Sequence, residues 1–364
     1  MPTPRPASPY AMTEMIEAEP AMAERLARRL AAAPATTALA HALTDAARAH
    51  RSITVTGCGT SEHAAMATAA ILADALGSAV RPAQALEYTR APHAGLLVAI
   101  SHEGGSWATN KALAAARGAG ATTALITVSD RSPGAALADI LVTTEEQDQS
   151  WCHTVGYLSP IVVAASLGGI LRGTALDPAA MRALLQVADA EAATTEVARA
   201  LAGCDRLLVA GSGIDYVSAR EFALKVEEGA HLPATAHHLE TILHGLLAAA
   251  NEHTGFVLFL TDADALGAVL VERSLKVLRA VAALGMPTAA ILAADLGDDD
   301  VPLPLTPAGR LALPLARVLP RGVNAALGSA IPLQLLAERL ARARGTNPDT
   351  IGREDPRQAA AADA

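Results

Sequence analysis

The sequence predicts an α/β protein made of two doubly wound, flavodoxin-like parallel sheets in tandem. Short apolar runs alternate along the chain with Gly-rich turns and longer helix-like segments, which is typical of parallel strands joined by helices. The pattern also repeats, because the turn at Gly211 matches the turn at Gly57, 154 residues earlier (211 minus 57). Two copies of one alternating pattern therefore indicate two modules of one kind.

In the first copy, an apolar run at residues 53–56 leads into the Gly57-Cys58-Gly59-Thr60-Ser61 turn, and an Ala-rich helix follows to about residue 76. A second strand at 96–100 leads into a turn at 101–106, and a helix and a strand at 123–128 follow. The polar segment 145–157 has no clear period and precedes a long apolar helix that ends near residue 171.

The second copy has predicted strands at 207–210, 255–260 and 287–292 and a helix at 264–284. Before the first copy, we expect loose chain at 1–9, a short helix from 10 that ends at Pro20, and amphipathic helices over 21–50. The predicted parts are an N-terminal tail with entry helices (1–50), a first module (51–172), a linker helix (173–202), a second module (203–345) and a C-terminal tail (346–364).

Composition narrows the class of protein. A chain of 364 residues can form two cores, and 51% hydrophobic with 2% aromatic residues predicts cores of Ala, Leu and Val. A net charge of −9 argues against a nucleic-acid surface. The three cysteines are odd in number and far apart, which predicts a reducing compartment and no disulfide framework. We expect no membrane span and no signal peptide, and hence a cytoplasmic protein with no membrane partner.

The most informative stretch is 207–250. A strand leads into Gly211-Ser212-Gly213 and then into a helix, and a helix start after such a turn favours anionic ligands. Glu221, Lys225 and Glu228 have the spacing i, i+4 and i+7, which places them on one helix face. A His244-Gly245 step follows 16 residues after Glu228 (244 minus 228).

This stretch resembles the second module of the double-SIS (sugar isomerase) family, which includes the isomerase domain of glucosamine-6-phosphate synthase and fructosamine deglycases. The family pattern is roughly G-x-G-x-x-Y-x-x-A-x-E-x-A-L-K-x-x-E followed by a His-Gly step. Segments 331–337 and 345–349 resemble its C-terminal helix and its G-x-N-P-D tail, so the resemblance covers nearly all of 10–357. The matching residues are Gly211, Gly213, Tyr216, Ala219, Glu221, Ala223, Leu224, Lys225, Glu228, His244 and Gly245.

The resemblance implies aldose–ketose isomerisation, or a related deamination or deglycation, at C1/C2 of a sugar or amino sugar, with phosphorylated substrates expected. It makes Glu228 the general base and His244 the ring-opening acid/base. Without it, Glu228 is a solvated helix carboxylate and His244 a surface histidine. Lys225 either forms an exposed pair with Glu221, worth a few tenths of a kcal/mol, or positions groups in the site.

The resemblance also implies that the turns of the first module bind the substrate phosphate. Hydroxyls and N–H groups at helix starts suit that role. One residue departs from the pattern: Glu103 stands where the family often has a phosphate-binding Ser. Two like charges about 4 Å apart repel by roughly 4 kcal/mol at a surface-like dielectric. Glu103 therefore either points away or indicates a ligand other than an ordinary phosphosugar, and a protonated His102 would offset part of the repulsion. The full set of predicted substrate-binding residues is Gly59, Thr60, Ser61, Ser101, His102, Glu103, Ser106, Thr154, Gly211, Ser212 and Lys225.

Further departures concern the chain ends and the histidines. We expect no glutaminase domain, and the tail lacks the family Lys, with Arg353 and Arg357 as its nearest cations. The spacing of His231, His237, His238 and His244 matches no common zinc signature, so no metal site and no cofactor are expected. The family commonly completes its site across a homodimer, which is the expected partner besides a sugar or sugar phosphate. The alternative is a non-catalytic sugar-phosphate sensor, but 1–50 lacks a basic helix-turn-helix.

Overall fold

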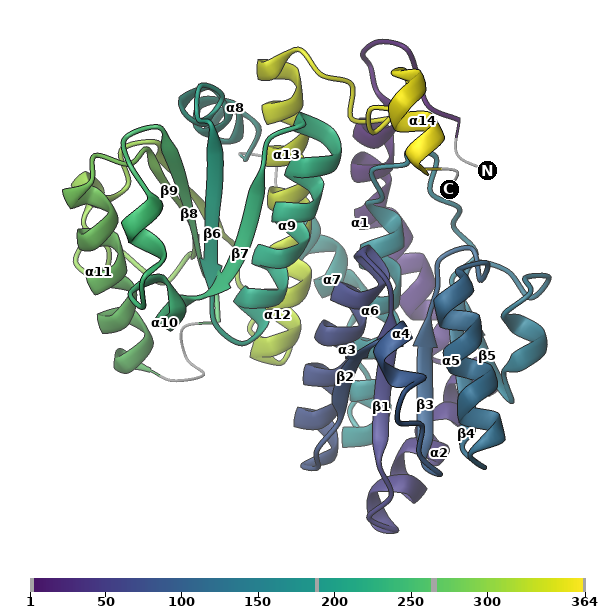
Figure 1. The fold of residues 1–364 in the computed structure, drawn as a ribbon. Helices are drawn as coiled ribbons and strands as arrows, with labels where there is room; N and C mark the ends of the chain where they lie inside the picture. The colour runs from purple at the N-terminus through teal and green to yellow at the C-terminus, as the bar shows by residue number, and fades with distance from the viewer. Residues whose placement is uncertain (1–2, 187–189, 263–266, 363–364) are drawn as a thin grey trace. The chain divides into compact units, whose positions relative to one another are not determined.

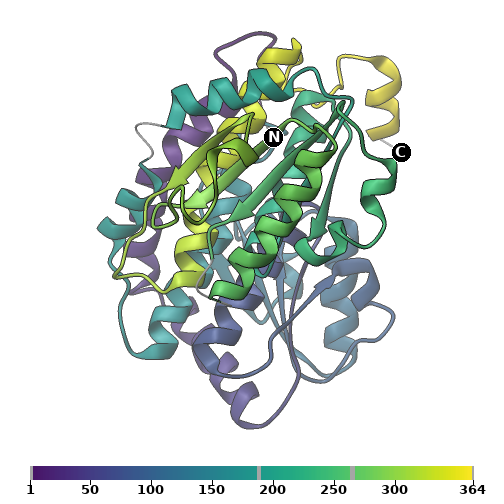
Figure 2. The same cartoon turned by 90° about the vertical axis from the view of Figure 1, so that its left-hand side faces the viewer.

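The computed structural model describes residues 3–186, 190–262 and 267–362. It contains two compact units, which we call the first unit (Glu19–Gln147 and Val155–Ala183) and the second unit (Met1–Ala18, Asp148–Thr154 and Leu184–Ala364). Each unit has a five-stranded parallel sheet flanked by helices (Figure 1 and Figure 2). The predicted α/β class with two doubly wound parallel sheets is confirmed.

The first unit has the strand order β2-β1-β3-β4-β5, and every neighbouring pair is parallel. β1 and β3 are buried along their whole length, which explains why both are continuous apolar runs. The strands are β1 (Ile53–Gly57), β2 (Arg81–Gln84), β3 (Leu96–Ile100), β4 (Thr122–Thr127) and β5 (Ile140–Thr143). The helices that lie in this unit or enter it are α1 (Ala11–Leu30), α2 (Pro34–Arg48), α3 (Thr60–Leu76), α4 (Ala85–Tyr88), α5 (Trp107–Gly118), η1 (Ala135–Leu137), α6 (Val155–Arg172) and α7 (Pro178–Leu185).

The second unit has the order β10-β9-β8-β6-β7, again all parallel. The start of the predicted helix 264–284 lies outside the described residues. The rest of the prediction corresponds to α11. The strands are β6 (Arg206–Gly211), β7 (Ala234–His238), β8 (Thr254–Leu260), β9 (Thr288–Ala293) and β10 (Gly309–Leu313). The helices are α8 (Ala190–Leu201), α9 (Ile214–Ala230), α10 (Leu239–Ile242), η2 (Leu246–Ala249), α11 (Ala268–Ala283), η4 (Leu303–Leu305), α12 (Arg321–Gly328), α13 (Ala330–Arg344) and α14 (Pro356–Ala362).

The repeat extends to backbone detail. α3 and α9 each have 17 residues and start 154 residues apart, and α4 and α10 keep the same offset. Both long helices begin after a glycine in the same positive-φ conformation, which favours glycine: Gly59 has φ 56° and Gly213 has φ 59°. A Cβ on Gly57 or Gly211 would lie 2.4 Å from the carbonyl oxygen four residues later, so both turns require glycine.

The two copies differ after α4 and α10. Ile53 of β1 pairs with Leu96, whereas the equivalent Leu207 of β6 pairs with Gly255. The second copy therefore has five more residues between its short helix and its next strand (159 against 154). His244 lies in this longer connection, which has no equivalent of the same length in the first unit.

Two local predictions were wrong. The helix that begins near Tyr10 does not end at Pro20 but continues as α1 to Leu30, because Pro removes only one backbone donor from a helix whose neighbouring turns are buried. The expectation of no membrane span assumed that no apolar run is long enough to cross a membrane, and that premise was also wrong. Among the described residues, α6 has 18 residues with a mean hydropathy of 1.5, but 83% of it is buried, as in the core helix of a soluble protein.

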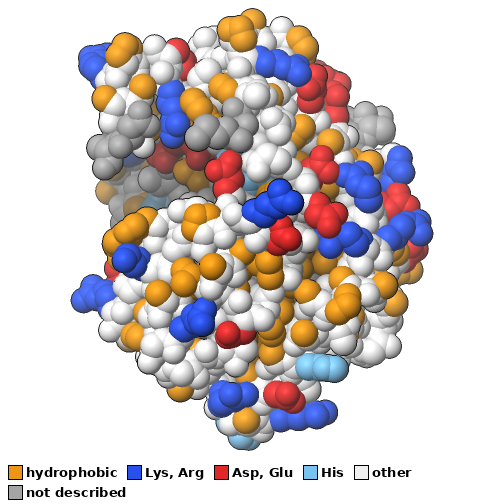
Figure 3. Space-filling model, turned by 90° about the vertical axis from the view of Figure 1, so that its right-hand side faces the viewer, with side chains coloured by type: hydrophobic (Ala, Val, Ile, Leu, Met, Phe, Trp, Pro, Cys, Tyr) orange, Lys and Arg blue, Asp and Glu red, His pale blue; other side chains and the backbone are white. Residues whose placement is uncertain are grey.

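Surface charge follows the composition. On the face drawn in Figure 3, basic and acidic side chains are interspersed, and no large area of one sign is visible. Mixed charge of this kind gives no electrostatic footprint for a polyanion on that face.

Candidate functional site

The last three turns of α9 hold a buried cluster of charges. Lys225 has no exposed side-chain surface, and its Nζ lies 2.5 Å from Glu228 Oε2 and 3.5 Å from Glu221 Oε1. Glu221 is also fully buried, whereas 23% of the Glu228 side chain is exposed. The three residues thus share one helix face as predicted, and the interpretation of Lys225 as part of an exposed surface pair is wrong.

The electrostatics of this cluster suit a proton-transfer group. Burial raises the pKa of Glu228 above its ordinary value, although the Lys225 ammonium opposes the shift. Burial alone would lower the pKa of Lys225, but the charges of Glu228 and Glu221 raise it overall. A partly exposed carboxylate with a raised pKa beside a fixed cation is typical of functional sites, where burial and specific partners shift titration together.

The segment Asp148–Thr154 packs against this end of α9, although the chain on either side of it belongs to the first unit. Cys152 is fully buried, with its Sγ 3.9 Å from the carbonyl oxygen of Lys225. Burial raises the pKa of the Cys152 thiol well above its usual range, so the thiol is not a nucleophile. Burial, assisted by the Lys225 charge, lowers the pKa of His153 to about 4, so this imidazole is neutral at physiological pH.

Sequence reasoning missed Cys152 and His153 as neighbours of the cluster. The buried Asp148 carboxylate shapes their loop by accepting hydrogen bonds from the backbone N–H groups of Ser150 (3.2 Å) and Thr154 (2.7 Å). The polar residues of this segment show no helix-like or strand-like repeat, so the sequence could not predict where the segment packs. Only the carboxylate followed by small polar residues, a common pattern for a self-bonded loop, hinted at its structure.

Thr154, a predicted substrate-binding residue, is fully buried. Its carbonyl oxygen accepts a hydrogen bond from Gln334 Nε2 at 3.3 Å, and its own hydroxyl has no hydrogen-bond partner among the described residues. The backbone of Thr154 therefore fastens the loop to α13, and its hydroxyl is buried, so nothing in this chain's geometry exposes the predicted substrate-binding group.

The C-terminal tail lies over the same end of α9. Thr346 donates a hydrogen bond to the carbonyl oxygen of Gly229 at 2.7 Å. Arg353 stacks over the ring of Trp151 at 4.2 Å, and Arg357 pairs with Asp355 at the surface. Neither tail arginine contacts Glu228 among the described residues, so the missing family Lys has no direct replacement in the contacts of this chain.

His244 lies apart from Glu228 in the contacts of a single chain. Two thirds of its side chain is exposed (67%), and its Nε2 lies 2.8 Å from Glu240 Oε1. Glu240 also binds Arg273, and these two partners, Arg273 first, lower the pKa of Glu240 to about 2. The structure therefore places the two predicted catalytic residues in one unit but does not bring them into contact.

The turns of the first unit present hydroxyls at the starts of α3 and α5. Gly59 precedes α3, whose first residues are Thr60 and the half-buried Ser61. Ser101 is buried after β3, and its hydroxyl donates to the hydroxyl of Ser106 at 3.2 Å, at the start of α5. Both turns lie at carboxyl ends of adjacent parallel strands, where ligands of open α/β sheets bind.

Glu103 is exposed in the second of these turns, and its carboxylate accepts a hydrogen bond from Gln147 Nε2 at 3.1 Å. His102 is 8% exposed, and its carbonyl oxygen accepts hydrogen bonds from the Thr127 hydroxyl and the Val128 N–H. The carboxylate is thus held at the surface of the turn, and among the described residues neither Ser101 nor Ser106 forms a hydrogen bond with it.

In the second unit, the side chain of Asp215 lies across the carboxyl ends of β6 and β8. Asp215, four residues after Gly211, is fully buried, and it accepts hydrogen bonds from the backbone N–H groups of Thr261 (2.9 Å) and Asp262 (3.1 Å). Burial raises its pKa, which these hydrogen bonds partly oppose. The Asp215 carboxyl group therefore takes up the backbone donors of Thr261 and Asp262 in the turn after β8, and an incoming anion would have to compete for them.

Metal ligands do not gather in the described part of the chain. Within residues 3–186, 190–262 and 267–362, no group of three or more His, Cys, Asp or Glu side chains is placed to hold a metal ion.

Comparison with known proteins identifies the first module. Residues 47–169 match the SIS domain model. This chain contains a SIS domain. It is also 31% identical over 370 residues to the glutamine–fructose-6-phosphate aminotransferase (isomerizing) of Symbiobacterium thermophilum, a match that covers 93% of the chain. The chain spans only 57% of the length of that relative.

Two solved structures share the fold over nearly the whole chain. The C-terminal domain of a glucosamine-fructose-6-phosphate aminotransferase from Francisella tularensis has a TM-score of 0.79 at 19% identity, covering 93% of this chain and 97% of its own. A tagatose-6-phosphate ketose/aldose isomerase from Escherichia coli has a TM-score of 0.76 at 21% identity, covering 96% and 97%. Both modules thus share the double-SIS fold, as the motifs predicted.

Proposed function

We propose that this SIS-domain protein catalyses a proton transfer between C1 and C2 of a sugar or amino sugar, as an aldose–ketose isomerase or a closely related deaminase or deglycase. The observation that supports the proposal most is the contact between Lys225 and Glu228, because it combines a buried cation with a carboxylate that is both partly exposed and of raised pKa. Isomerisation through an enediol requires such a base and a nearby positive charge for the developing negative oxygen.

In this proposal Glu228 removes the proton from one carbon and returns it to the other. Its raised pKa brings the carboxylate closer to the operating pH, which makes the protonated intermediate less costly. Lys225 holds the carboxylate in place with a 2.5 Å contact, and Glu221 holds Lys225 from the other side. Thr60, Ser61, Ser101 and Ser106 are assigned to phosphate binding in substrates that carry one.

His244 is assigned to ring opening. It is exposed and has no contact with Glu228 among the described residues, which favours a role toward a second copy of the chain in a homodimer. Its partner Glu240 would orient the imidazole and stabilise the imidazolium, as carboxylates do for catalytic histidines.

The test begins with a screen of free and phosphorylated ketoses and amino sugars for those that raise the melting temperature of the protein. Solvent-deuterium incorporation is then measured for the sugars that bind. Glu228→Gln should lower exchange by at least ~10²-fold while the protein remains folded. Glu227→Gln is the matched control, because Glu227 is the adjacent and exposed carboxylate. Unchanged exchange in Glu228→Gln would refute the assignment, and sugar binding by the wild type without any exchange would favour the non-catalytic sensor.

A further inference from the structure

The first unit contains a pocket that is lined by residues of β1, β2 and α4. Its volume is about 350 Å³, which is within the range of small-molecule sites. The lining residues come from the start of β1, from β2, from α4 and from the loop before β3: Ser52, Thr54, Arg81, Pro82, Ala83, Gln84, Glu87, Tyr88, Ala91 and His93. It reaches down to Ser52 at the amino end of β1, away from the turns assigned above to phosphate binding.

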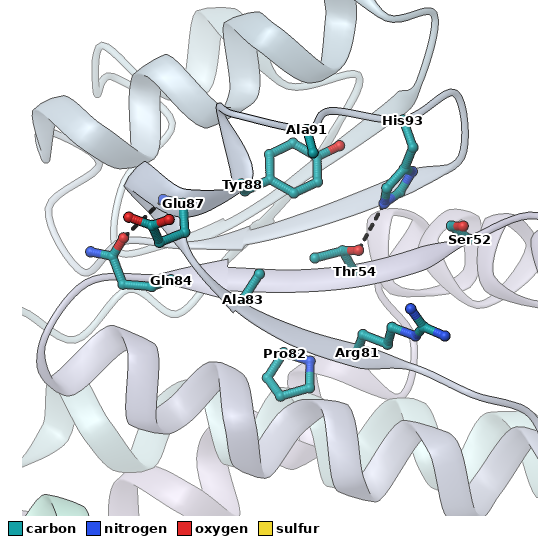
Figure 4. A pocket seen from close by; sticks show the side chains of 10 residues that line it. All are labelled: Ser52, Thr54, Arg81, Pro82, Ala83, Gln84, Glu87, Tyr88, Ala91 and His93. Carbon is teal, nitrogen blue, oxygen red and sulfur yellow. Dashed lines mark hydrogen bonds between the residues drawn. The ribbon is translucent and has the colours of Figure 1, made fainter.

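One end of this pocket is rich in hydrogen-bond donors. Figure 4 shows Ser52, His93 and the guanidinium of Arg81 at one end, with Gln84 and Glu87 at the other. Arg81 is exposed, and its side chain forms no ion pair or hydrogen bond within the described residues. A guanidinium presents a planar fork of donors that pairs with a carboxylate in two parallel hydrogen bonds.

The floor of the same end holds a buried hydroxyl with an unused proton. Tyr88 is 5% exposed, and the backbone N–H of His93 approaches its hydroxyl oxygen, but the hydroxyl proton has no acceptor among the described residues. Burial raises the pKa of Tyr88, so the hydroxyl keeps its proton. A buried donor without an acceptor costs about 1–3 kcal/mol, which an acceptor entering the pocket would recover.

His93 extends this arrangement. Its Nε2 lies 2.8 Å from the Thr54 hydroxyl, its ring meets the Tyr88 ring edge-on at 5.4 Å, and its buried Nδ1 has no partner among the described residues. Burial lowers the pKa of His93, so the imidazole is neutral and offers one donor and one acceptor. A neutral ring with one donor and one acceptor nitrogen suits a hydroxyl group of a ligand better than a second charged group of that ligand.

We propose that this pocket is an accessory binding site for a small polyhydroxylated carboxylate whose carboxylate pairs with Arg81. A monoanion fits because Arg81 is the one Lys or Arg of the lining, so the second negative charge of a dianion such as a phosphate would remain unpaired. The polyol part fits because hydroxyl groups can form hydrogen bonds with Ser52, Thr54 and the Glu87 carboxylate. The apolar lining residues, Pro82, Ala83 and Ala91, would contact the carbon atoms of the ligand. This site is separate from the proposed isomerase residues and does not depend on them.

The experiment is calorimetric titration of gluconate into the full chain, with sorbitol as the matched uncharged polyol. Gluconate should bind at one site per chain, and sorbitol at least tenfold more weakly. Arg81→Gln should weaken gluconate binding tenfold or more, about 1.4 kcal/mol, and Tyr88→Phe severalfold. Arg48→Gln is the control for general charge loss, because Arg48 is exposed in the same unit and outside the pocket.

Ser106→Ala separates this site from the proposed phosphate turn, and it should leave gluconate binding unchanged. Absence of saturable gluconate binding would overturn the proposal. So would equal affinity in Arg81→Gln and the wild type, or loss of gluconate binding in Ser106→Ala. Failure of the isomerase assignment would appear instead in the Glu228→Gln exchange experiment, so the two results are independent.

Discussion

The ammonium of Lys225 lies 2.5 Å from the carboxylate of Glu228, and no part of the Lys225 side chain is exposed. A buried ion pair contributes little to stability as a whole, because desolvation offsets most of its attraction, but breaking it leaves uncompensated charge. The pair is therefore better explained by its chemistry than by its contribution to folding, and its removal is the first test.

Lys225→Met should destabilise the protein by about 3–5 kcal/mol, because Glu221 and Glu228 would lose their shared cation in a buried site. Urea unfolding measures the loss. Lys276→Met is the matched control, since the Lys276–Glu272 pair on α11 is exposed and should be worth no more than about 0.5 kcal/mol. Adding Glu221→Gln to Lys225→Met should restore part of the stability, and no restoration would show that packing, not charge, causes the loss.

Glu228→Gln should become more stable relative to the wild type as the pH rises. The folded protein holds the Glu228 proton to a higher pH than the unfolded chain does, because burial raises the pKa of this group. The wild type therefore loses unfolding free energy as the pH rises from the ordinary Glu value through the folded pKa, and the amide does not. Unfolding curves between pH 4.5 and 8 measure the difference, and parallel profiles for the two proteins would contradict it.

His153 should make the protein sensitive to acid. Its pKa is lowered to about 4, so between pH 6.5 and 4 the unfolded chain takes up a proton that the folded protein refuses. Stability from this group is present above the ordinary pKa and falls by up to about 3 kcal/mol across the window. His153→Asn should flatten that part of the profile, whereas the exposed His253→Asn should not.

These groups show what the sequence could and could not reveal. The face shared by Glu221, Lys225 and Glu228 was predictable, because helical spacing alone places i, i+4 and i+7 together. Cys152 contacts Lys225 across 73 positions of sequence, and that contact depends on how the loop after Asp148 folds onto α9. No local pattern encodes such a path.

The same distinction holds for the sheets. β1, β3, β6 and β8 are buried on both faces, so burial alone requires the apolar runs by which they were predicted. β2 (Arg81–Gln84) and β7 (Ala234–His238) escaped prediction because both are short, polar edge strands. Their strand conformation comes from pairing with β1 and β6, which is tertiary context and not intrinsic preference.

The exposed His244 should affect catalysis without affecting folding. His244→Ala should change the free energy of unfolding by no more than about 0.5 kcal/mol, because the side chain is two thirds exposed. If the proposed function is correct, the turnover rate of His244→Ala should fall far more with closed-ring substrates than with open-chain analogues. Mixing His244→Ala with Glu228→Gln protomers should restore activity if each site takes one residue from each copy. No restoration, with heterodimers shown to form, would exclude a shared site.

Glu103 should set which ligand charge the first unit accepts. The carboxylate is exposed in the turn between β3 and α5 and accepts a hydrogen bond from Gln147 at 3.1 Å. A Ser at this position would donate a hydrogen bond to a phosphate, whereas an ionised carboxylate can only accept and adds a like charge. We therefore expect the native ligand to carry less negative charge at this end than a sugar 6-phosphate does.

Calorimetric titration of fructose 6-phosphate into Glu103→Ser and the wild type tests this expectation. Glu103→Ser should bind at least tenfold more tightly, about 1.4 kcal/mol by the relation between affinity and free energy. Glu103→Gln separates the two causes, because it removes the charge but keeps the length that reaches Gln147. An intermediate gain in Glu103→Gln would assign part of the effect to repulsion and the rest to the new donor. Tight binding by the wild type that Glu103→Ser leaves unchanged would show that Thr60, Ser61, Ser101 and Ser106 bind the phosphate while Glu103 stays with Gln147.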